Sequence, residues 1–106
     1  GDEPDNEFQI EHVLPQTLNS IWASNFTEEE HHNLVHKAGN LIPLKSRMNN
    51  SVGQSSFQSK KDKILSGSSY ITARQLFDQH LEWSPSSIKE RTSLMAEWAV
   101  SRWKYF

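Results

Sequence analysis

Four polar residues at three places in the chain have the types and the spacing for hydrolysis of a phosphodiester. Glu11 and His12 are adjacent, Asn40 opens a short apolar run, and Asn49 follows nine residues later. Cleaving a phosphodiester needs a base for water, neutralisation of the phosphate oxygens and stabilisation of the leaving oxygen. A neutral imidazole, with an ordinary pKa of about 6.5, suits the first task. A hard divalent cation held by a carboxylate and an amide oxygen suits the other two.

The local patterns around these residues predict the elements that position them. Phe8–His12 alternates apolar and polar residues, as in a strand with one buried face, and Pro15 ends it. Asn40–Leu44 is a short apolar run that predicts a second strand, and its Pro43 favours an edge position. Asn49 stands in front of a helix. The spacing therefore predicts a unit of strand, strand and helix.

Capping and stop residues predict the remaining helices. They cover Thr27 to Ala38, Ser55 or Ser56 to Gly67, roughly Thr72 to Leu81, and a longer helix that starts near Ser84 and Pro85. In the longest helix the apolar residues form a broad stripe, which predicts a core-facing side. Its members are Ile88, Leu94, Met95, Trp98, Ala99 and Trp103.

Length and composition limit the classes of protein to consider. The 106 residues suffice for one domain with a modest core, and we expect residues 1–6 to be a flexible acidic leader or linker remnant and residues 7–106 to be the folded domain. No apolar run approaches the roughly 20 residues that span a bilayer. The absence of cysteine excludes disulfides and thiolate metal sites and fits a cytoplasmic protein. The net charge of -2 argues mildly against a dedicated nucleic-acid coat.

Several motifs, in order along nearly the whole chain, resemble one known group of nucleases. The group is the C-terminal HNH nuclease domain of modification-dependent bacterial restriction and phage-defence proteins, the GmrSD-like and SspE-like proteins. The matching segments are Ile10–Gln16, Gly39–Leu44, Asn49, Phe57 with Lys60, and then Trp83, Ile88 and Arg91.

This resemblance implies an α+β, mainly helical fold. Its centre is a ββα-metal (His-Me finger) unit of a short two-stranded sheet plus helix, wrapped by additional helices. The implied activity is that of a metal-dependent DNA endonuclease, which nicks or cleaves DNA as the effector domain of a bacterial anti-phage restriction system. The implied cofactor is a divalent metal, Mg²⁺ in the first place, with Mn²⁺ as a plausible substitute.

The resemblance also implies a role for each of the four residues. His12 matches the general base that activates water, and Glu11 matches the metal-binding acid before it. Asn40 matches the asparagine that orients the base, and Asn49 matches the metal ligand from the helix. A slip of one residue in the motif would make Asn50 the ligand in place of Asn49.

The implied partners are DNA and an N-terminal nucleotide-hydrolysing or modification-sensing domain of the full-length protein, with no membrane. Lys60 matches a basic position of the family pattern. Asp62 is the only acid in the stretch that holds the basic residues, so a local basic surface for the DNA backbone is expected despite the acidic total. The expected contacts are Lys45, Arg47, Lys60, Lys61 and Lys63.

Two other functions stay open at this point. A catalytically silent DNA-binding or protein-interaction module with the same fold would fit the overall acidity. A zinc-stabilised structural domain would use His31, His32 and His36, of which the last two are four residues apart and share a helix face. A solvated helix with His36 packed near the core is the favoured interpretation of these histidines. For Trp83, Trp98 and Trp103, packing in the core is favoured over stacking on bases.

Overall fold

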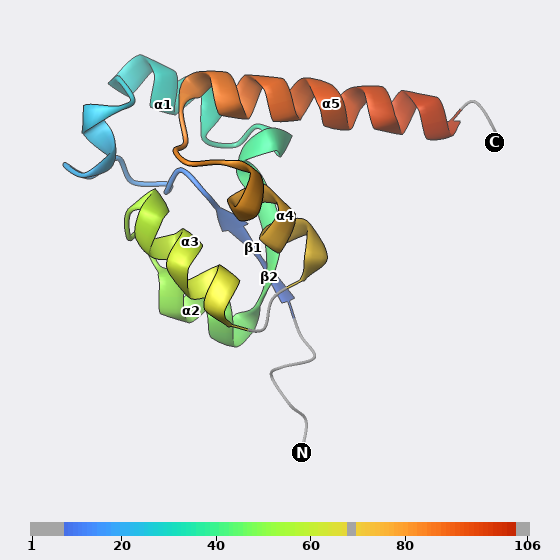
Figure 1. Cartoon of the computed structure of the whole chain (residues 1–106). Helices are drawn as coiled ribbons and strands as arrows, with labels where there is room; N and C mark the ends of the chain where they lie inside the picture. The colour runs from blue at the N-terminus through green and yellow to red at the C-terminus, as the bar shows by residue number, and fades with distance from the viewer. Residues whose placement is uncertain (1–7, 68–69, 104–106) are drawn as a thin grey trace.

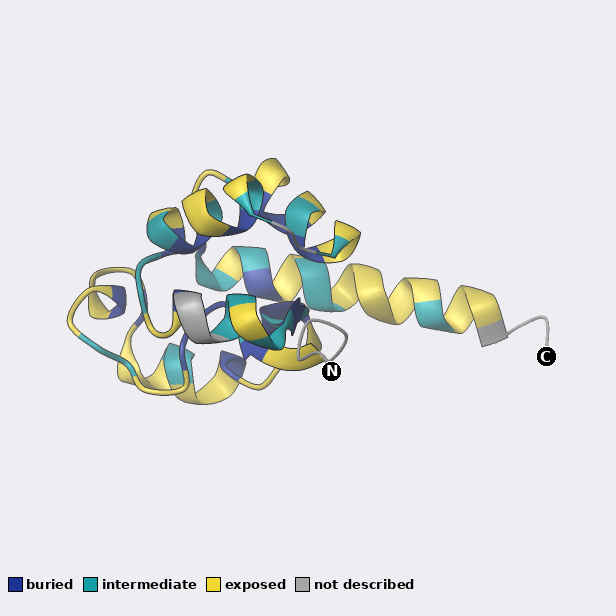
Figure 2. Ribbon diagram, turned by 90° about the horizontal axis from the view of Figure 1, so that it is seen from below, coloured by how far each residue is buried: buried dark blue, intermediate teal, exposed yellow. Residues whose placement is uncertain are grey.

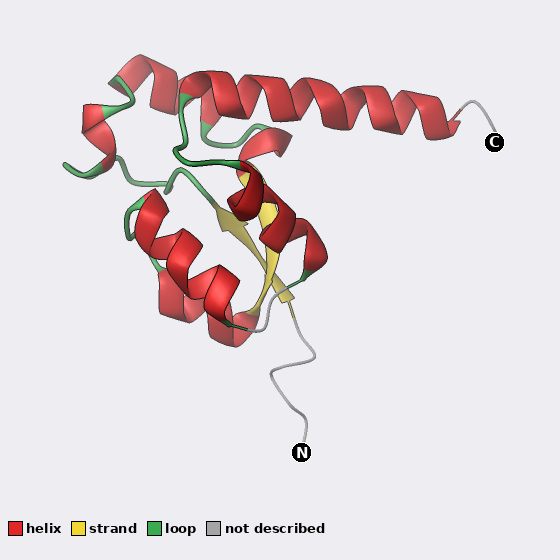
Figure 3. Ribbon diagram, viewed as in Figure 1, coloured by secondary structure: helices red, strands yellow, loops and turns green. Residues whose placement is uncertain are grey.

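The computed structural model describes residues 8–67 and 70–103. Its centre is a two-stranded antiparallel sheet (Figures 1 and 3). Strand β1 is Phe8–His12 and strand β2 is Leu41–Lys45. The register places His12 opposite Leu41 and Glu11 opposite Ile42. The end of β1 therefore lies beside the start of β2, so that Asn40 is brought next to the residues that follow His12. The leader predicted over residues 1–6 lies outside the described residues.

Helices surround this sheet and make up most of the structure (Figure 3). Helix α2 follows β2 directly and contacts both strands, whereas α4 packs on β2 and α3 packs on α2 and α4. The fold is thus α+β, mainly helical, with a ββα unit at its centre, and this prediction is confirmed. The helical elements are the 3₁₀-helix η2 Trp22–Ser24, α1 Glu28–Leu34, the 3₁₀-helix η3 Ala38–Asn40, α2 Ser46–Val52, α3 Phe57–Ser66, α4 Ile71–Gln79 and α5 Pro85–Trp103.

The helix starts follow the capping residues seen in the sequence. Thr27 and Glu30 form a complete capping box at α1, and the Ser56 side chain accepts a hydrogen bond from the backbone of Ser59 at α3. Helix α1 ends earlier than predicted, at Leu34, because the chain turns into η3 before it enters β2. Helix α2 was not predicted from the local pattern, which placed Asn49 in front of a helix, whereas Asn49 lies within α2. Its sequence is polar and has no side-chain cap, so its contacts with the strands must provide much of its stability.

A cluster of aromatic rings occupies the core between α3, α4 and the loop before α5. Phe57 stacks on Phe77 with ring centroids 5.0 Å apart, and on Trp83 with centroids 5.7 Å apart. These rings belong to the hydrophobic core, which also contains the buried residues Ile42 and Leu44 of β2. None of the helices within the described ranges has the length and apolar character needed to cross a membrane.

The prediction that the apolar face of β1 is buried is wrong. Phe8 and Ile10 are 60% and 51% exposed, whereas Glu11 is buried. Glu11 lies opposite the fully buried Ile42 in the sheet, so both side chains are on the face that the helices cover. The strand therefore directs its carboxylate, and not its apolar residues, towards the interior.

The stripe on α5 also differs from its prediction. Ile88 is fully buried, but Leu94 and Trp98 are 58% and 62% exposed. Only the N-terminal part of α5 packs on η3, and the rest of the helix extends past the body of the domain (Figure 2). Core packing is therefore correct for Trp83 and wrong for Trp98, and the Trp103 side chain lies outside the described residues.

The contact between η3 and α5 depends on the absence of a side chain at Gly39. A Cβ atom there would overlap the carbonyl oxygen of Ile88 and the side chain and backbone nitrogen of Thr92. The Gly39 N–H instead donates to Thr92 Oγ1 at 2.8 Å. Arg91 reinforces this contact by donating to the carbonyls of Gly39 at 2.9 Å and Leu41 at 3.0 Å.

We predict that Gly39→Ala destabilises the fold by about 1 to 3 kcal/mol, the usual cost of overpacking, because the added methyl meets backbone atoms that cannot move alone. The matched control is Gly67→Ala, whose methyl would meet the end of the flexible Met48 side chain and the Lys63 carbonyl. Urea unfolding curves measure both variants. Equal loss of stability in the two variants would show that the close approach of η3 to α5 is unimportant.

Candidate active site

Glu11, His12 and Asn49 line one pocket of about 350 Å³. The end of β1 supplies the first two residues and α2 supplies the third. Ile10, Pro15, Gln16, Gly53 and Gln54 complete the wall. Three of the four residues singled out by their chemistry therefore share one cavity, although 37 residues separate His12 from Asn49.

A buried ion pair holds Glu11. Its Oε2 accepts a hydrogen bond of 2.7 Å from Nζ of Lys60, whose side chain is fully buried. Burial raises the pKa of Glu11, and the nearby ammonium partly offsets this effect. Burial likewise lowers the pKa of Lys60, with Glu11 acting in the opposite direction. The same ammonium donates to the carbonyls of His12 at 3.0 Å and Val13 at 2.9 Å, so Lys60 fixes the backbone at the end of β1.

This arrangement corrects the expectation that Lys60 contacts the DNA backbone. Its three N–H groups are taken by one carboxylate and two carbonyls, and no part of its side chain is exposed. Removing it would leave the Glu11 carboxylate buried without a cation, which is strongly destabilising. Lys60 is thus part of the structure of the site.

His12 contacts a second histidine. Its Nε2 lies 3.2 Å from Nδ1 of His36, and the two rings meet edge to face with centroids 5.2 Å apart. Burial lowers the pKa of His12, and the charges of His36 and Lys60 lower it further. Each of these effects favours the neutral imidazole, the form that a general base requires.

Asn40 is fully buried and all its hydrogen-bonding positions are used. Oδ1 accepts from the Leu14 backbone at 2.8 Å and from the Trp83 indole at 3.0 Å. Nδ2 donates to the carbonyls of Leu14 at 3.0 Å and Val35 at 2.9 Å. Asn40 is not among the residues that line the pocket, and its side-chain hydrogen bonds hold the backbone that follows His12 and do not reach the imidazole.

Asn49 has the feature expected of an oxygen ligand. Its Nδ2 donates to Oε1 of Gln9, whereas its Oδ1 is buried and has no hydrogen-bond partner within the described residues. A buried carbonyl oxygen without a partner is costly, and a bound cation would remove that cost. Glu11 and Asn49 on one pocket wall thus fit a hard divalent cation that keeps several waters. The side chain of Asn50, the alternative ligand, is not among those that the structure describes.

The other predicted DNA contacts lie on two helices and a strand end. Arg47 of α2 and Lys63 of α3 are exposed, and Lys45 ends β2 in a half-buried position. Lys61 is also half-buried, and its ammonium donates to the carbonyl of His80 at 2.8 Å. None of these side chains lines the pocket of Glu11 and His12.

The three histidines considered for zinc do not converge. His31 contacts the Pro15 carbonyl at 2.8 Å, and His36 pairs with His12. In the part of the chain that the structure describes, no group of three or more His, Asp or Glu side chains is placed to hold a metal ion. His36 is exposed and packs on His12, so the expected position near the core is wrong.

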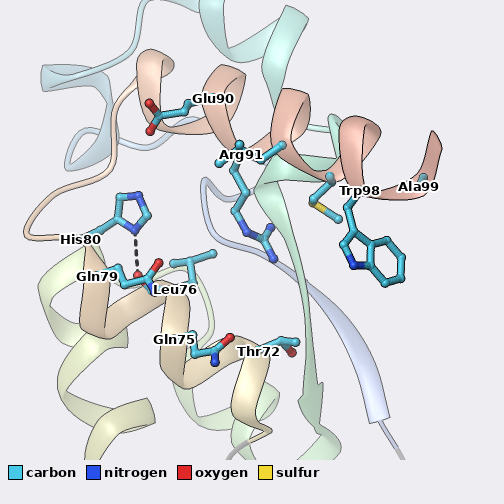
Figure 4. Close-up of a pocket in the computed structure, with 11 residues that line it drawn as sticks. Thr72, Gln75, Leu76, Gln79, His80, Glu90, Arg91, Trp98 and Ala99 are labelled. Atoms are coloured by element: carbon cyan, nitrogen blue, oxygen red, sulfur yellow. Dashed lines mark hydrogen bonds between the residues drawn. The ribbon is translucent and has the colours of Figure 1, made fainter. Parts of the chain in front are cut away.

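A larger hollow lies elsewhere, between α4 and α5 (Figure 4). It measures about 660 Å³ and is lined by Arg91 and Trp98 of α5 and by Gln75 and Leu76 of α4. It contains none of the four residues with candidate chemistry. Size alone would therefore select a different place, but among the described residues the buried polar side-chain atom without a hydrogen-bond partner belongs to Asn49 in the smaller pocket.

The match to a known family agrees with the site. The family model for the C-terminal domain of GmrSD restriction endonucleases matches residues 1–98. The chain therefore belongs to this family, and the resemblance noted in its sequence is confirmed. Searches of curated proteins and of solved structures find no match. The family is a domain of larger restriction proteins, so a further domain before it is expected in the full-length protein.

Sequence reasoning missed two partners in the site. The first is His36, which the sequence suggested as a side chain packed near the core or, from its spacing with His32, as a zinc ligand. The second is the pairing of Lys60 with Glu11, which are 49 residues apart. A lysine within a polar, basic stretch such as Lys60 to Lys63 looks exposed in a sequence, and only the three-dimensional packing beside Glu11 shows that Lys60 is buried.

We predict that acid weakens the fold through His12. Its pKa in the folded state lies below the ordinary 6.5, so between the two values the unfolded chain binds more protons and stability rises with pH. Urea unfolding of the wild type and of His12→Gln at pH values from about 5 to 8 measures this contribution. The wild type should lose more stability than the variant as pH falls below 6.5. Parallel curves would contradict the lowered pKa.

Proposed function

We propose that this domain is a metal-dependent DNA endonuclease of the HNH (ββα-metal, His-Me finger) type. It nicks or cleaves DNA as the effector of a bacterial anti-phage restriction system. The observation that carries the proposal is one pocket that holds a neutral imidazole, a buried carboxylate and a buried amide oxygen without a partner. Membership of a restriction endonuclease family supports the same activity.

In this proposal His12 removes a proton from the attacking water. The Nε2 atom of His12 is engaged with His36, so Nδ1 is the nitrogen left to accept that proton. The water oxygen then forms a bond to phosphorus, the bond from phosphorus to the 3′ oxygen breaks, and the departing oxygen takes up a proton from solvent. The proton stays on the imidazole until solvent removes it.

Glu11 and Asn49 would hold the divalent cation, with Mg²⁺ as the first choice and Mn²⁺ as a substitute. When bound, the cation supplies positive charge to the phosphate oxygens and to the leaving oxygen. Lys60 holds the Glu11 carboxylate in place and favours its ionised form, which partly offsets the effect of burial. Asn40 and Lys60 together fix the backbone of residues 12–14, on which the position of the base depends.

The DNA backbone would approach the open side of the pocket. Arg47 and Lys63 are exposed on α2 and α3, and the exposed Gln16 and Gln54 offer amide donors at the rim. Such contacts position a duplex and carry no sequence information. We therefore expect cutting with broad sequence tolerance, with recognition of modified or foreign DNA supplied by the rest of the larger protein.

We predict that His12→Ala lowers the rate of plasmid cutting by about a hundredfold to ten-thousandfold, the usual contribution of a general base. Supercoiled plasmid is incubated with Mg²⁺ or Mn²⁺, and nicked and linear products are followed on a gel. His32→Ala is the matched control, because this exposed histidine lies outside the pocket.

Undiminished cutting by His12→Ala would remove His12 from the mechanism. Binding of DNA without cutting by the wild type, at any divalent ion, would favour the second candidate, a catalytically silent binding module. The buried pair of Glu11 and Lys60 is the observation that favours that candidate, because one carboxylate oxygen already has a cation beside it.

A further inference from the structure

We propose that His36 is a positioning residue for the general base. It sets the tautomer of His12, so that the proton of the neutral ring is on Nε2 and the lone pair of Nδ1 faces the reacting water. The inference rests on the proposed role of His12. It adds a function for a residue that the sequence suggested only as a zinc ligand or a packed side chain.

The first support is the contact itself. His12 Nε2 and His36 Nδ1 are 3.2 Å apart, within hydrogen-bonding distance. Among the described residues, no other group forms a hydrogen bond with the His12 ring. The tautomer of a histidine is set by the hydrogen bond that one of its nitrogens makes, so His36 is the group that decides it.

The second support is that only one of two arrangements leaves a base. If His12 donates from Nε2 to His36 Nδ1, the His12 Nδ1 keeps its lone pair. If His36 donates from Nδ1, the proton of neutral His12 moves to its own Nδ1, and the ring has no free lone pair for water. His36 is exposed, so in the first arrangement water can accept a hydrogen bond from its Nε2–H and no polar atom of the pair is left unsatisfied.

The third support is that one buried side chain fixes the backbone beside both histidines. Nδ2 of Asn40 donates to the carbonyl of Leu14, two residues after His12, and to that of Val35, the residue before His36. The Lys37 N–H, on the other side of His36, donates to the Leu34 carbonyl at 3.0 Å. Asn40 thus orients the base indirectly, by keeping the two segments that carry the imidazoles at a fixed separation.

The test compares two substitutions of His36. His36→Asn keeps an acceptor, because the amide oxygen of asparagine stands where Nδ1 of histidine stood. His36→Leu has a similar branched shape and no acceptor. His32→Leu, on the exposed part of the preceding helix, is the control for loss of a surface histidine.

The first readout is the tautomer, which needs no nuclease activity. Nitrogen-15 NMR of the imidazoles at about pH 8.5, well above the ordinary pKa of about 6.5, distinguishes a proton on Nδ1 from one on Nε2. We expect His12 to carry it on Nε2 in the wild type and in His36→Asn, and to show a mixture in His36→Leu. A wild-type proton on Nδ1, or an unchanged tautomer in His36→Leu, would overturn the proposal.

The second readout is cutting. We expect His36→Leu to lower kcat by about 10-fold to 100-fold with little change in KM, as for other groups that orient a reacting residue. His36→Asn should recover most of this loss, which a purely structural role would not predict. If the tautomer changes as expected but the wild type cuts no DNA, the positioning role stands and the nuclease function fails.

Discussion

The buried carboxamide of Asn40 is the interaction on which the arrangement of the site depends. Its two polar atoms make four hydrogen bonds that join the loop after β1, the segment before η3 and the Trp83 indole in the core. In a dry interior such bonds are costly to break, since each lost partner leaves a buried polar group unsatisfied. Asn40 therefore contributes to the site indirectly, by fixing the backbone segments next to His12 and His36.

The buried pair of Glu11 and Lys60 adds a second constraint at the same place. Burial favours the neutral form of each group, and each favours the charged form of the other. The ammonium also binds two backbone carbonyls, so the pair closes the end of β1 against α3. A carboxylate kept next to a cation inside the protein is available to a second cation only on its remaining side. In the proposed metal site, the Asn49 oxygen, which has no partner among the described residues, would be the second ligand.

Local patterns predicted most elements of the fold, α2 excepted, but not which side chains are buried. Thr27, Ser56 and Pro85 mark helix starts because caps act within one turn of the chain, and β1 has the predicted bounds. Burial depends on distant partners, which is why Ile10 and Trp98 are exposed and Lys60 is buried. The motif predicted that Glu11, His12 and Asn49 share one site, and all three line one pocket. The contact of His12 with His36 was not predicted, because it too depends on residues far apart in the chain.

The central claim is that a divalent cation binds beside His12, between Glu11 and Asn49. Its most direct test is addition of Mn²⁺ to the nitrogen-15 labelled protein, since the paramagnetic ion broadens the amide signals of the residues around it. The account predicts broadening of Glu11, His12 and Asn49 at low Mn²⁺, and its loss in Asn49→Leu while the fold is retained. Broadening centred elsewhere, or unchanged in Asn49→Leu, would contradict it.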